Sequence, residues 1–233
     1  MSFIVAIDGP AGTGKGTITN LVAKKMNLIN IDTGATYRCV ALAVLKNNIQ
    51  LNNEEEIIKI AKNIDIDFKQ TQNIQKVFLN GEEVTKEIRT PMVSSIVSQV
   101  SSIIEVRLQM VELQRKLAKG KDVIMEGRDI TTYVFPNADV KIYMDADEEE
   151  RAKRRFLENK EKGSNETYEE VLQAIRKRDK LDKEKKMGAL KIAEDAIYVD
   201  TTNKTIQEVE EEILKIITNV RNKKGMIQNE RII

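Results

Sequence analysis

The chain has 233 residues, of which 41% are hydrophobic and 32% are charged, so it is long enough for one or two domains with a buried core. Its 38 Lys and Arg residues almost cancel its 37 Asp and Glu residues, which argues against a protein whose main task is to coat nucleic acid. The chain has no histidine and one cysteine, Cys39, which excludes Ser-His-Asp and Cys-His catalysis, histidine-bound zinc and an internal disulfide.

The sequence predicts no membrane-spanning helix and no signal peptide. No apolar run approaches the roughly 18 residues that a membrane-spanning helix needs. The first apolar run, residues 3–7, lacks the basic lead of a signal peptide. We therefore expect a cytoplasmic monomer with no membrane partner and no nucleic-acid partner.

Short apolar runs of strand length alternate with amphipathic segments along the chain. The predicted strands are residues 3–7, 28–31, 122–125, 140–144 and 196–199. Strands that alternate with helices form βαβ units, so the sequence predicts an α/β fold with a parallel sheet of about five strands covered by helices.

Helical periodicity predicts where helices cover this sheet. One continuous helix is expected from an apolar face made of Val97, Val100, Ile104, Leu108 and Val111. The last helix begins at a capping box formed by Thr205 and Glu208. Residues 221–233 lack a clear period, and we expect this tail to be loosely held.

Two regions depart from the alternation of strands and helices. Residues 63–90 contain strand-like arms around Asn80-Gly81, a hairpin signal, and predict a small antiparallel insertion. Residues 150–178 are strongly charged and interrupted at Gly163, which predicts two helices that form an arm of low local stability. The charge runs at 151–155 and 176–186 are typical of solvent-exposed helix faces.

The strongest motif is the glycine-rich segment between the first strand and the first helix. Glycines let successive N–H groups turn towards a phosphate chain, and the next helix presents its positive N-terminus to the same anion. Lys15 adds a point charge for the outer phosphates, and the Thr17 hydroxyl can ligate Mg²⁺. The predicted ATP-binding residues are Gly9, Pro10, Ala11, Gly12, Thr13, Gly14, Lys15, Gly16 and Thr17.

Other interpretations of this loop have less support. A dinucleotide-binding loop needs an acidic residue about 20 residues on, but Asp32 belongs to a different motif. A guanine-specific switch needs Asn-Lys-x-Asp, and the Asn-Lys at Asn203 lacks the aspartate. Arg38 and Arg128, however, each follow a predicted strand. Because ligands of open α/β sheets bind beyond the carboxyl ends of strands, both arginines indicate a second anionic substrate.

Together these motifs resemble those of the cytidylate kinases, which are nucleoside monophosphate kinases of the P-loop superfamily. The matching segments follow the family's order at residues 7–17, 32–38, 98–101, 126–129, 135–136, 150–155, 178–182, 194–197 and 200–202. The resemblance implies phosphoryl transfer from ATP, with Mg²⁺, to CMP or dCMP, giving ADP and CDP or dCDP, in pyrimidine metabolism.

The resemblance also implies how the chain is divided. Residues 1–220 would form a single P-loop kinase domain, followed by the tail at 221–233. Its parts would be a core at residues 1–32, 118–148 and 185–220, a monophosphate-binding region at 33–117 with the insertion at 63–90, and a closing helical lid at 149–180.

The resemblance implies a role for each matching side chain. Arg38 and Arg128 would hold the acceptor phosphate, and Arg154 and Arg155 on the lid would reach the transferred group. The implied catalytic residues are Lys15, Arg128, Arg154 and Arg155, and the implied metal site is Thr17 with Glu126 through water. The implied CMP-binding residues are Thr33, Arg38, Ser98, Arg107, Arg128, Asp129, Arg178 and Asp182, the last resembling the family's sugar-contacting aspartate.

The acceptor base can be argued from hydrogen bonding. The N4 amino group of cytosine can donate to Asp129, while Arg107, assisted by Ser98, can donate to the O2/N3 edge. Uracil presents O4 instead of the amino group and would leave a buried carboxylate unpaired. We therefore expect CMP and dCMP to be preferred over UMP.

The chain departs from the family pattern at Lys185, at the Gly188-Ala189 step and at Thr131. Lys185 replaces an arginine, Gly188-Ala189 replaces a Ser-Pro or Ala-Pro step, and Thr131 replaces a glycine. Lysine keeps the charge but loses the bidentate fork. The alternatives that the sequence leaves open are a kinase of UMP or of a small alcohol, which would need a base to activate its hydroxyl, and an ATP-binding regulator without transfer activity.

Overall fold

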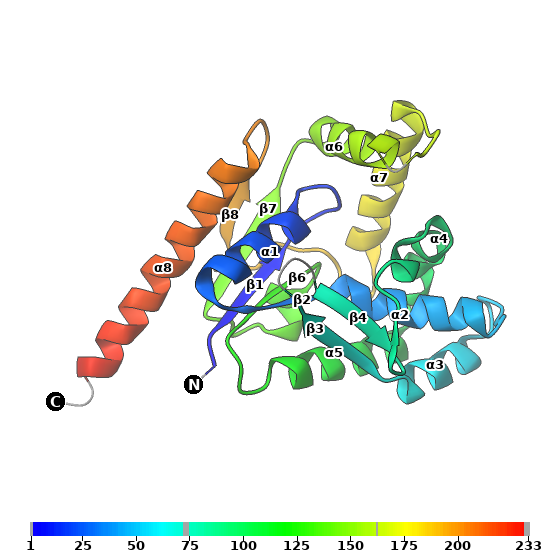
Figure 1. Ribbon diagram of the computed structural model, residues 1–233, viewed down its shortest axis with the longest axis horizontal. Helices are drawn as coiled ribbons and strands as arrows, with labels where there is room; N and C mark the ends of the chain where they lie inside the picture. The colour runs from blue at the N-terminus through cyan, green and yellow to red at the C-terminus, as the bar shows by residue number, and fades with distance from the viewer. Residues whose placement is uncertain (1, 72–74, 162, 231–233) are drawn as a thin grey trace.

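The structure is a computed structural model that describes residues 2–71, 75–161 and 163–230. At its centre is a five-stranded sheet of parallel strands in the order β2-β6-β1-β7-β8 (Figure 1). The strands are β1 (Ile4–Asp8), β2 (Ile29–Asp32), β6 (Val123–Gly127), β7 (Val140–Asp145) and β8 (Ile197–Asp200). All five predicted strands are confirmed, with small shifts at their ends.

Helices cover both faces of this sheet because its strands are apolar on both sides. The helices are α1 (Lys15–Met26), α2 (Thr33–Lys46), α3 (Glu54–Asn63), α4 (Pro91–Val100), α5 (Ile104–Ala118), α6 (Glu148–Glu161), α7 (Tyr168–Glu184) and α8 (Ile206–Glu230), with short turns η1 (Glu87–Arg89) and η2 (Ile130–Val134), the second π-helical. Residues of α1 and α8 share one apolar cluster with β1 and β7, whereas α5 and η2 share another with β2 and β6.

The region before β6 corrects one prediction. The expected continuous helix is two helices, α4 and α5, separated at residues 101–103. Ile104 and Leu108, expected on its buried face, are 42% and 46% exposed. Helix α5 instead buries a face that contains Val106 and the charged Arg107. A search for apolar residues at helical spacing does not identify such a face, because the buried guanidinium group interrupts the pattern.

The predicted antiparallel insertion is confirmed as a three-stranded sheet, β3 (Ile66–Gln70), β4 (Gln75–Leu79) and β5 (Glu82–Glu83). Asn80 and Gly81 both have positive φ, 51° and 84°, as the tight turn between β4 and β5 requires. Residues 72–74, which also belong to the predicted insertion, lie outside the described residues.

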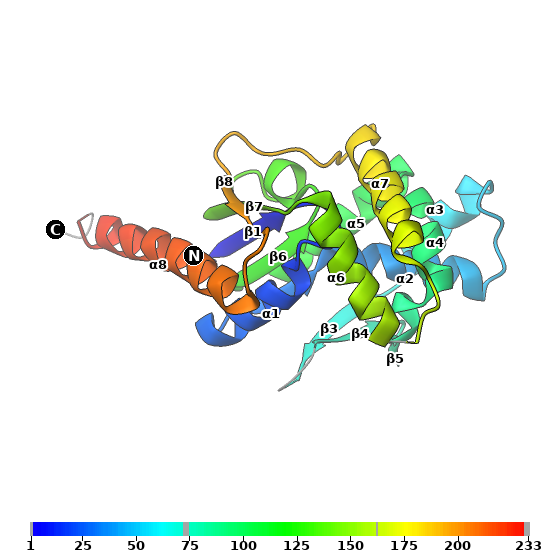
Figure 2. The ribbon, with the colours of Figure 1, turned by 90° about the horizontal axis from the view of Figure 1, so that it is seen from above.

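Helices α6 and α7 form a hairpin at one edge of the molecule (Figure 1), and it lies away from the last turns of α8 (Figure 2). Thr167 and Glu170 form a capping box that begins α7. A small apolar core of Ala152, Val171 and Ile175 joins the two helices. The predicted pair of helices is therefore present, and it has a core of its own.

The tail at residues 221–233, which was expected to be loosely held, is helical as far as Glu230. Helix α8 continues without interruption to Glu230, while residues 231–233 lie outside the described residues. Arg221 donates to Asp122 at 2.8 Å, and Lys224 pairs with Asp139. These polar contacts hold the helix against the body of the protein, and a search for apolar periodicity does not detect them. In the described part of the chain, no helix is both long and apolar enough to cross a bilayer.

Candidate active site

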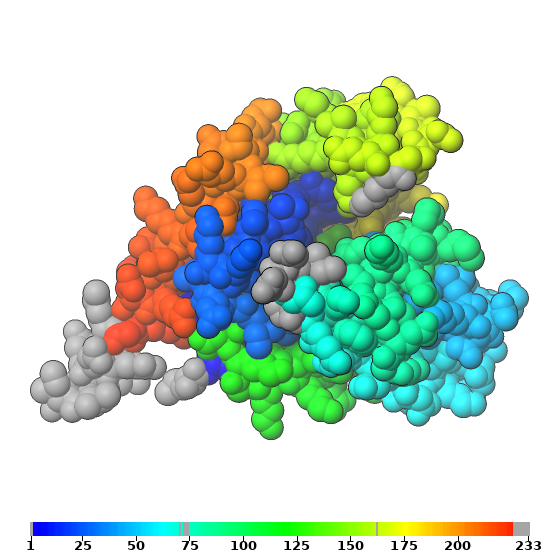
Figure 3. Space-filling view, in the orientation of Figure 1, coloured from blue at the N-terminus to red at the C-terminus, as the bar shows by residue number. Residues whose placement is uncertain are grey.

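A cleft of about 1060 Å³ opens beyond the carboxyl ends of β1, β2 and β6. Figure 3 shows the surface hollowed between the hairpin of α6 and α7 and helix α4, with the blue N-terminal segment behind. Every residue predicted for the site lines this cleft except Gly9 and Pro10. Those two are buried beneath the loop, and a side chain at Gly9 would overlap the backbone oxygen of Met144. They shape the loop rather than face a ligand.

The glycine loop turns as its sequence requires. Gly12 and Gly14 have φ of 84° and 85°, a conformation that favours glycine, and α1 begins directly after Gly14. The ammonium group of Lys15 donates to the Pro10 carbonyl at 2.6 Å and to Thr13 Oγ1 at 3.1 Å. Burial, with repulsion from Arg128, lowers the pKa of Lys15. The loop therefore holds a desolvated cation against neutral oxygens.

Two carboxylates lie side by side where β2 and β6 end. Glu126 lines the cleft beside Asp32, and burial together with the Asp32 charge raises the pKa of Glu126. Asp32 accepts a bond from Arg89 at 3.0 Å. A side chain at Gly16 would lie 3.0 Å from Glu126 Oε1, so the glycine allows this carboxylate to approach α1 closely. This arrangement favours a cation between the carboxylates and the loop.

Opposite the loop, Asp182 on α7 holds three cations. It accepts from Arg128 Nε at 2.8 Å and from Lys185 Nζ at 3.0 Å, and Arg178 Nε lies 3.9 Å away. Burial opposes the ionisation of Asp182, but these cations outweigh it and lower its pKa. Lys185, the residue that departs from the family pattern, also donates to Ser101 Oγ at 3.2 Å.

Arg38 and Arg178 are partly desolvated. Arg38 Nη1 donates to the Ile88 carbonyl at 3.1 Å and to Ser94 Oγ at 2.8 Å. Burial lowers the pKa of Arg178 to about 10, and Arg128 repels it further. Within the described residues, Arg178 Nε has no hydrogen-bond partner. Both side chains line the cleft, where an anion would compensate their loss of solvent.

Arg107 and Asp129, the residues predicted to recognise the base, form a buried ion pair. They are 2% and 4% exposed, and Arg107 Nη1 also donates to the Ser101 carbonyl at 3.2 Å. The Arg107 guanidinium lies over the ring of Tyr37, 5.2 Å from its centre. Tyr37 and Ser101 both line the cleft and were missed as site residues. The sequence could have indicated both residues, because each lies within one of the segments that match the family's motifs.

Asp8 joins the glycine loop to the segment that carries Asp129. Its carboxylate accepts from the Ile130 N–H at 2.9 Å, the Thr131 N–H at 2.7 Å and the Thr131 hydroxyl at 2.6 Å. Burial raises the pKa of Asp8 to about 6. Thr131, which stands in place of the family's glycine, thus adds a bond to the strand that leads into the loop.

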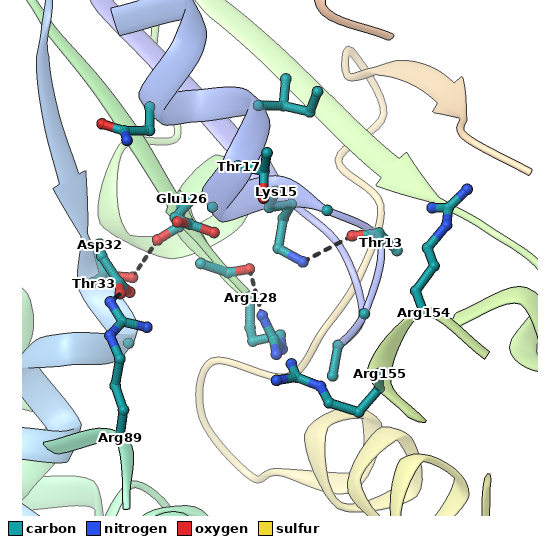
Figure 4. Close-up of a pocket in the computed structure, with 18 of the residues that line it drawn as sticks. Thr13, Lys15, Thr17, Asp32, Thr33, Arg89, Glu126, Arg128, Arg154 and Arg155 are labelled. Atoms are coloured by element: carbon teal, nitrogen blue, oxygen red, sulfur yellow. Dashed lines mark hydrogen bonds and ion pairs between the residues drawn. The ribbon is translucent and has the colours of Figure 1, made fainter. Parts of the chain in front are cut away.

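The lid arginines are bound within the protein in this structure. Arg154 donates to Thr201 Oγ1 at 3.1 Å and to the Thr201 carbonyl at 2.7 Å. Arg155 pairs with Glu158 at 3.1 Å, and Figure 4 shows its guanidinium pointing towards Arg128. Both arginines line the cleft together with Lys15.

The smaller predicted residues also lie in the cleft. The Thr33 hydroxyl donates to the Glu126 carbonyl at 2.6 Å and so ties the start of α2 to β6. Ser98 lines the cleft from α4, and the exposed Thr17 lines it from α1. The structure therefore brings together all the predicted side chains of the site.

Comparison with known proteins agrees with this geometry. The model of the family described as cytidylate kinase matches residues 5–219. The chain is 51% identical to a cytidylate kinase from Caldicellulosiruptor saccharolyticus and 47% identical to one from Bacillus cereus. Each match spans 216 residues, 93% of this chain and 96% of the relative. The chain belongs to the cytidylate kinase family.

Membership of the cytidylate kinase family makes the protein a nucleoside monophosphate kinase, so the predicted family and enzyme class are confirmed. The fold is shared with a solved structure of an uncharacterized protein from Eubacterium ventriosum. That match has a TM-score of 0.52 at 14% identity and covers 94% of this chain and 99% of the other. The predicted α/β fold is confirmed.

Proposed function

We propose that this protein transfers the γ-phosphoryl group of ATP to the 5′-phosphate of CMP or dCMP, giving ADP and CDP or dCDP. The observation that carries the proposal is one cleft that contains both the glycine loop and a separate set of cations beside a buried Arg107–Asp129 pair. A small-alcohol kinase and a regulator without transfer activity are not favoured, because neither needs that second set.

The glycine loop holds the phosphates of ATP. The N–H groups at residues 12–17 and the N-terminus of α1 supply fixed positive dipoles. Lys15 exchanges its two neutral oxygen partners for phosphate oxygens. Burial deprives the Lys15 ammonium of water in the free protein and lowers its pKa. A phosphate anion therefore stabilises this buried ammonium more than it would stabilise an ammonium on the exposed surface.

The residues at the ends of β2 and β6 fit Mg²⁺, which prefers oxygen ligands and is usually held by one or two carboxylates plus substrate phosphates. Thr17 and Glu126, the latter through water, would hold the ion, next to Asp32. An ion held there would supply positive charge against the negative charge that develops on the transferred phosphoryl group. Burial, with the Asp32 charge beside it, raises the pKa of Glu126, and a bound cation would oppose both effects.

The acceptor phosphate is held by Arg38, Arg128 and Arg178. Its second pKa lies near 6, so it is largely ionised at neutral pH and needs no general base. The main task is to bring two polyanions together, and guanidinium groups suit phosphate because they bind it with two parallel bonds. Arg154 and Arg155 approach the transferred group when the lid closes, and for this they must leave Thr201 and Glu158.

The base is recognised by Asp129 and Arg107, with Ser98 nearby on α4. In the free protein the two charges satisfy each other. Cytosine inserts with its N4 amino group on the carboxylate and its O2/N3 edge on the guanidinium. Asp182 accepts from the ribose, and Thr33 fixes the start of α2 beside the acceptor site.

The proposal includes a setting for the enzyme. We place the enzyme in pyrimidine metabolism in the cytoplasm, which its single cysteine fits, as a monomer without a membrane partner, and its near-zero net charge argues against a nucleic-acid partner. ATP, Mg²⁺ and CMP or dCMP are its only ligands in this scheme.

A coupled ADP-release assay with CMP, dCMP, UMP, AMP and GMP tests the proposal. We expect turnover of CMP and dCMP well above that of the other three. In the Asp129→Ala variant, KM for CMP should rise about tenfold to a hundredfold, and KM for UMP much less. Equal turnover of AMP and CMP would contradict the base assignment. An equal loss with CMP and UMP would show Asp129 to be structural.

A further inference from the structure

Arg151 is a charged residue that the sequence places on an exposed helix face and the structure buries. It lies in the first turn of α6 and is 6% exposed. Its Nε donates to the Ala146 carbonyl at 2.9 Å. Its Nη1 donates to the Ala11 carbonyl at 3.1 Å and to Asp179 Oδ2 at 2.6 Å. One guanidinium group thus contacts the glycine loop and both lid helices.

Two of the partners of Arg151, Ala11 and Asp179, lie on different elements around the cleft. Ala11 lies in the glycine loop and lines the cleft on the ATP side. A side chain at the next residue, Gly12, would lie 3.0 Å from Arg151 Cβ, so the loop and α6 pack in direct contact. Asp179 lies on α7, between Arg178 and Asp182 of the acceptor side.

Burial makes this connection stiff. The side chains of Arg151 and Asp179 are 7% and 11% exposed, and Asp179 Oδ1 has no hydrogen-bond partner among the described residues. A buried ion pair loses far more when one partner is removed than an exposed pair does. Any shift of the Ala11 carbonyl would therefore reach Asp179 through Arg151.

We propose that Arg151 is a positioning residue that couples the two substrate sites: ATP on the glycine loop strengthens the binding of CMP through Ala11, Arg151 and Asp179, and CMP strengthens the binding of ATP equally. The identity of the two ligands rests on the proposed function. The coupling itself depends only on contacts within this chain.

Calorimetric titration of CMP with and without a saturating non-hydrolysable ATP analogue and Mg²⁺ measures the coupling. We expect CMP to bind wild-type protein at least about fivefold more tightly with the analogue present, and the reverse titration must give the same factor. In Arg151→Gln this factor should fall towards one. Asp179→Asn should lower it too, and it keeps the shape of the side chain if Arg151→Gln folds poorly.

Arg176→Gln is the matched control. Arg176 pairs with Glu148 at 2.6 Å and so joins the same two helices, but at the surface, where the side chains are 47% and 37% exposed. This variant should keep the wild-type factor. If the coupling factor is also lost in Arg176→Gln, the proposal is wrong, because any contact between α6 and α7 would then be enough to couple the two sites.

Three further outcomes decide the matter. If Arg151→Gln and Asp179→Asn weaken both ligands but leave the factor intact, Arg151 only stabilises the fold and the proposal is wrong. A wild-type factor of one, with both ligands bound, overturns the coupling and leaves the proposed function standing. Wild-type protein that binds the analogue but not CMP contradicts the proposed function, and this inference with it.

Discussion

The two halves of the cleft hold their cations in opposite ways. On the ATP side, the hydrogen bonds of Lys15 go to neutral oxygens of the loop, at Pro10 and Thr13. On the acceptor side, Arg128 and Lys185 share the buried carboxylate of Asp182. The bonded partners of Lys15 are therefore neutral until phosphate binds, and Glu126 and Asp8 act on it only through space. Arg128 and Lys185, in contrast, already bond to a carboxylate.

Because of this difference, the cations of the two halves contribute unequally to ligand binding and to the stability of the free protein. A cation without a carboxylate partner lowers the stability of the free protein and gains most from an anionic ligand. Cations that already share a carboxylate hold their positions without ligand, and the ligand must compete for them. The acceptor site is therefore part of the folded framework, but the Lys15 ammonium is not.

Two substitutions, one in each half of the cleft, test this contrast. Of the changes considered, we expect this pair to differ most in its effect on the free energy of unfolding. Asp182→Asn should lower the free energy of unfolding by about 3–5 kcal/mol, because it leaves buried cations without their counter-charge. Lys15→Met should leave that free energy unchanged or raise it, although it abolishes phosphoryl transfer. Urea unfolding at neutral pH measures both.

Glu82→Gln serves as the control for loss of a carboxylate. Glu82 is exposed and bonds to Lys46 at 3.1 Å, so the change should stay within about 0.5 kcal/mol. Similar losses for Lys15→Met and Asp182→Asn would show that both halves depend on their charges in the same way and would remove the contrast.

Asp8 lies at the joint between the two halves, and its titration gives a second test. Its folded pKa of about 6 lies above the ordinary value of 3.8, so the folded state binds the proton more tightly than the unfolded state. Stability from this group is then present at about pH 4 and is lost as the pH rises through about 6, by up to about 3 kcal/mol. The Asp8→Asn variant lacks this dependence.

The measurement is the difference in unfolding free energy between wild type and Asp8→Asn from about pH 4 to about pH 7. The lost hydrogen bonds to Ile130 and Thr131 give a constant offset, so the slope, not the offset, is diagnostic. Wild type should lose its advantage as the pH rises. A flat difference would mean that the bonds from Ile130 and Thr131 compensate the burial of Asp8.

The sequence predicted well those features that depend on neighbours along the chain. The five strands and the glycine loop are local patterns, and a P-loop needs its glycines and Lys15 at fixed spacing. The Asn80-Gly81 turn is equally local. Features that depend on distant partners were not predictable in this way. Arg107 and Arg151 are buried only because Asp129 and Asp179 meet them in the fold.

The acceptor side depended more on family resemblance than the ATP side did. Its residues come from α2, α4, α5, β6 and α7, and no spacing rule connects them. The resemblance named Asp129 and Arg107, but it did not indicate that the segment after α7 packs on them. That contact involves Gly188, where this chain departs from the Ser-Pro or Ala-Pro step.

Gly188 gives the smallest and most specific test of the acceptor side. It has φ of 66°, and a side chain there would overlap the guanidinium of Arg107 and the carboxylate of Asp129. Gly188→Ala should therefore disturb the base-recognising pair and raise KM for CMP about tenfold, since overpacking a buried site costs about 1–3 kcal/mol. KM for ATP should not change.

Gly120→Ala separates the overlap from backbone strain. Gly120 has a similar φ of 73° but open space where a side chain would go. Both variants should lose about 1 kcal/mol of stability from the backbone, and only Gly188→Ala should also lose CMP affinity. If the two variants have the same KM for CMP, the segment after α7 does not line the site that binds the base. If Gly188→Ala raises KM for ATP as much as for CMP, the overlap disturbs the whole cleft, and the two halves are less independent than their charge patterns indicate.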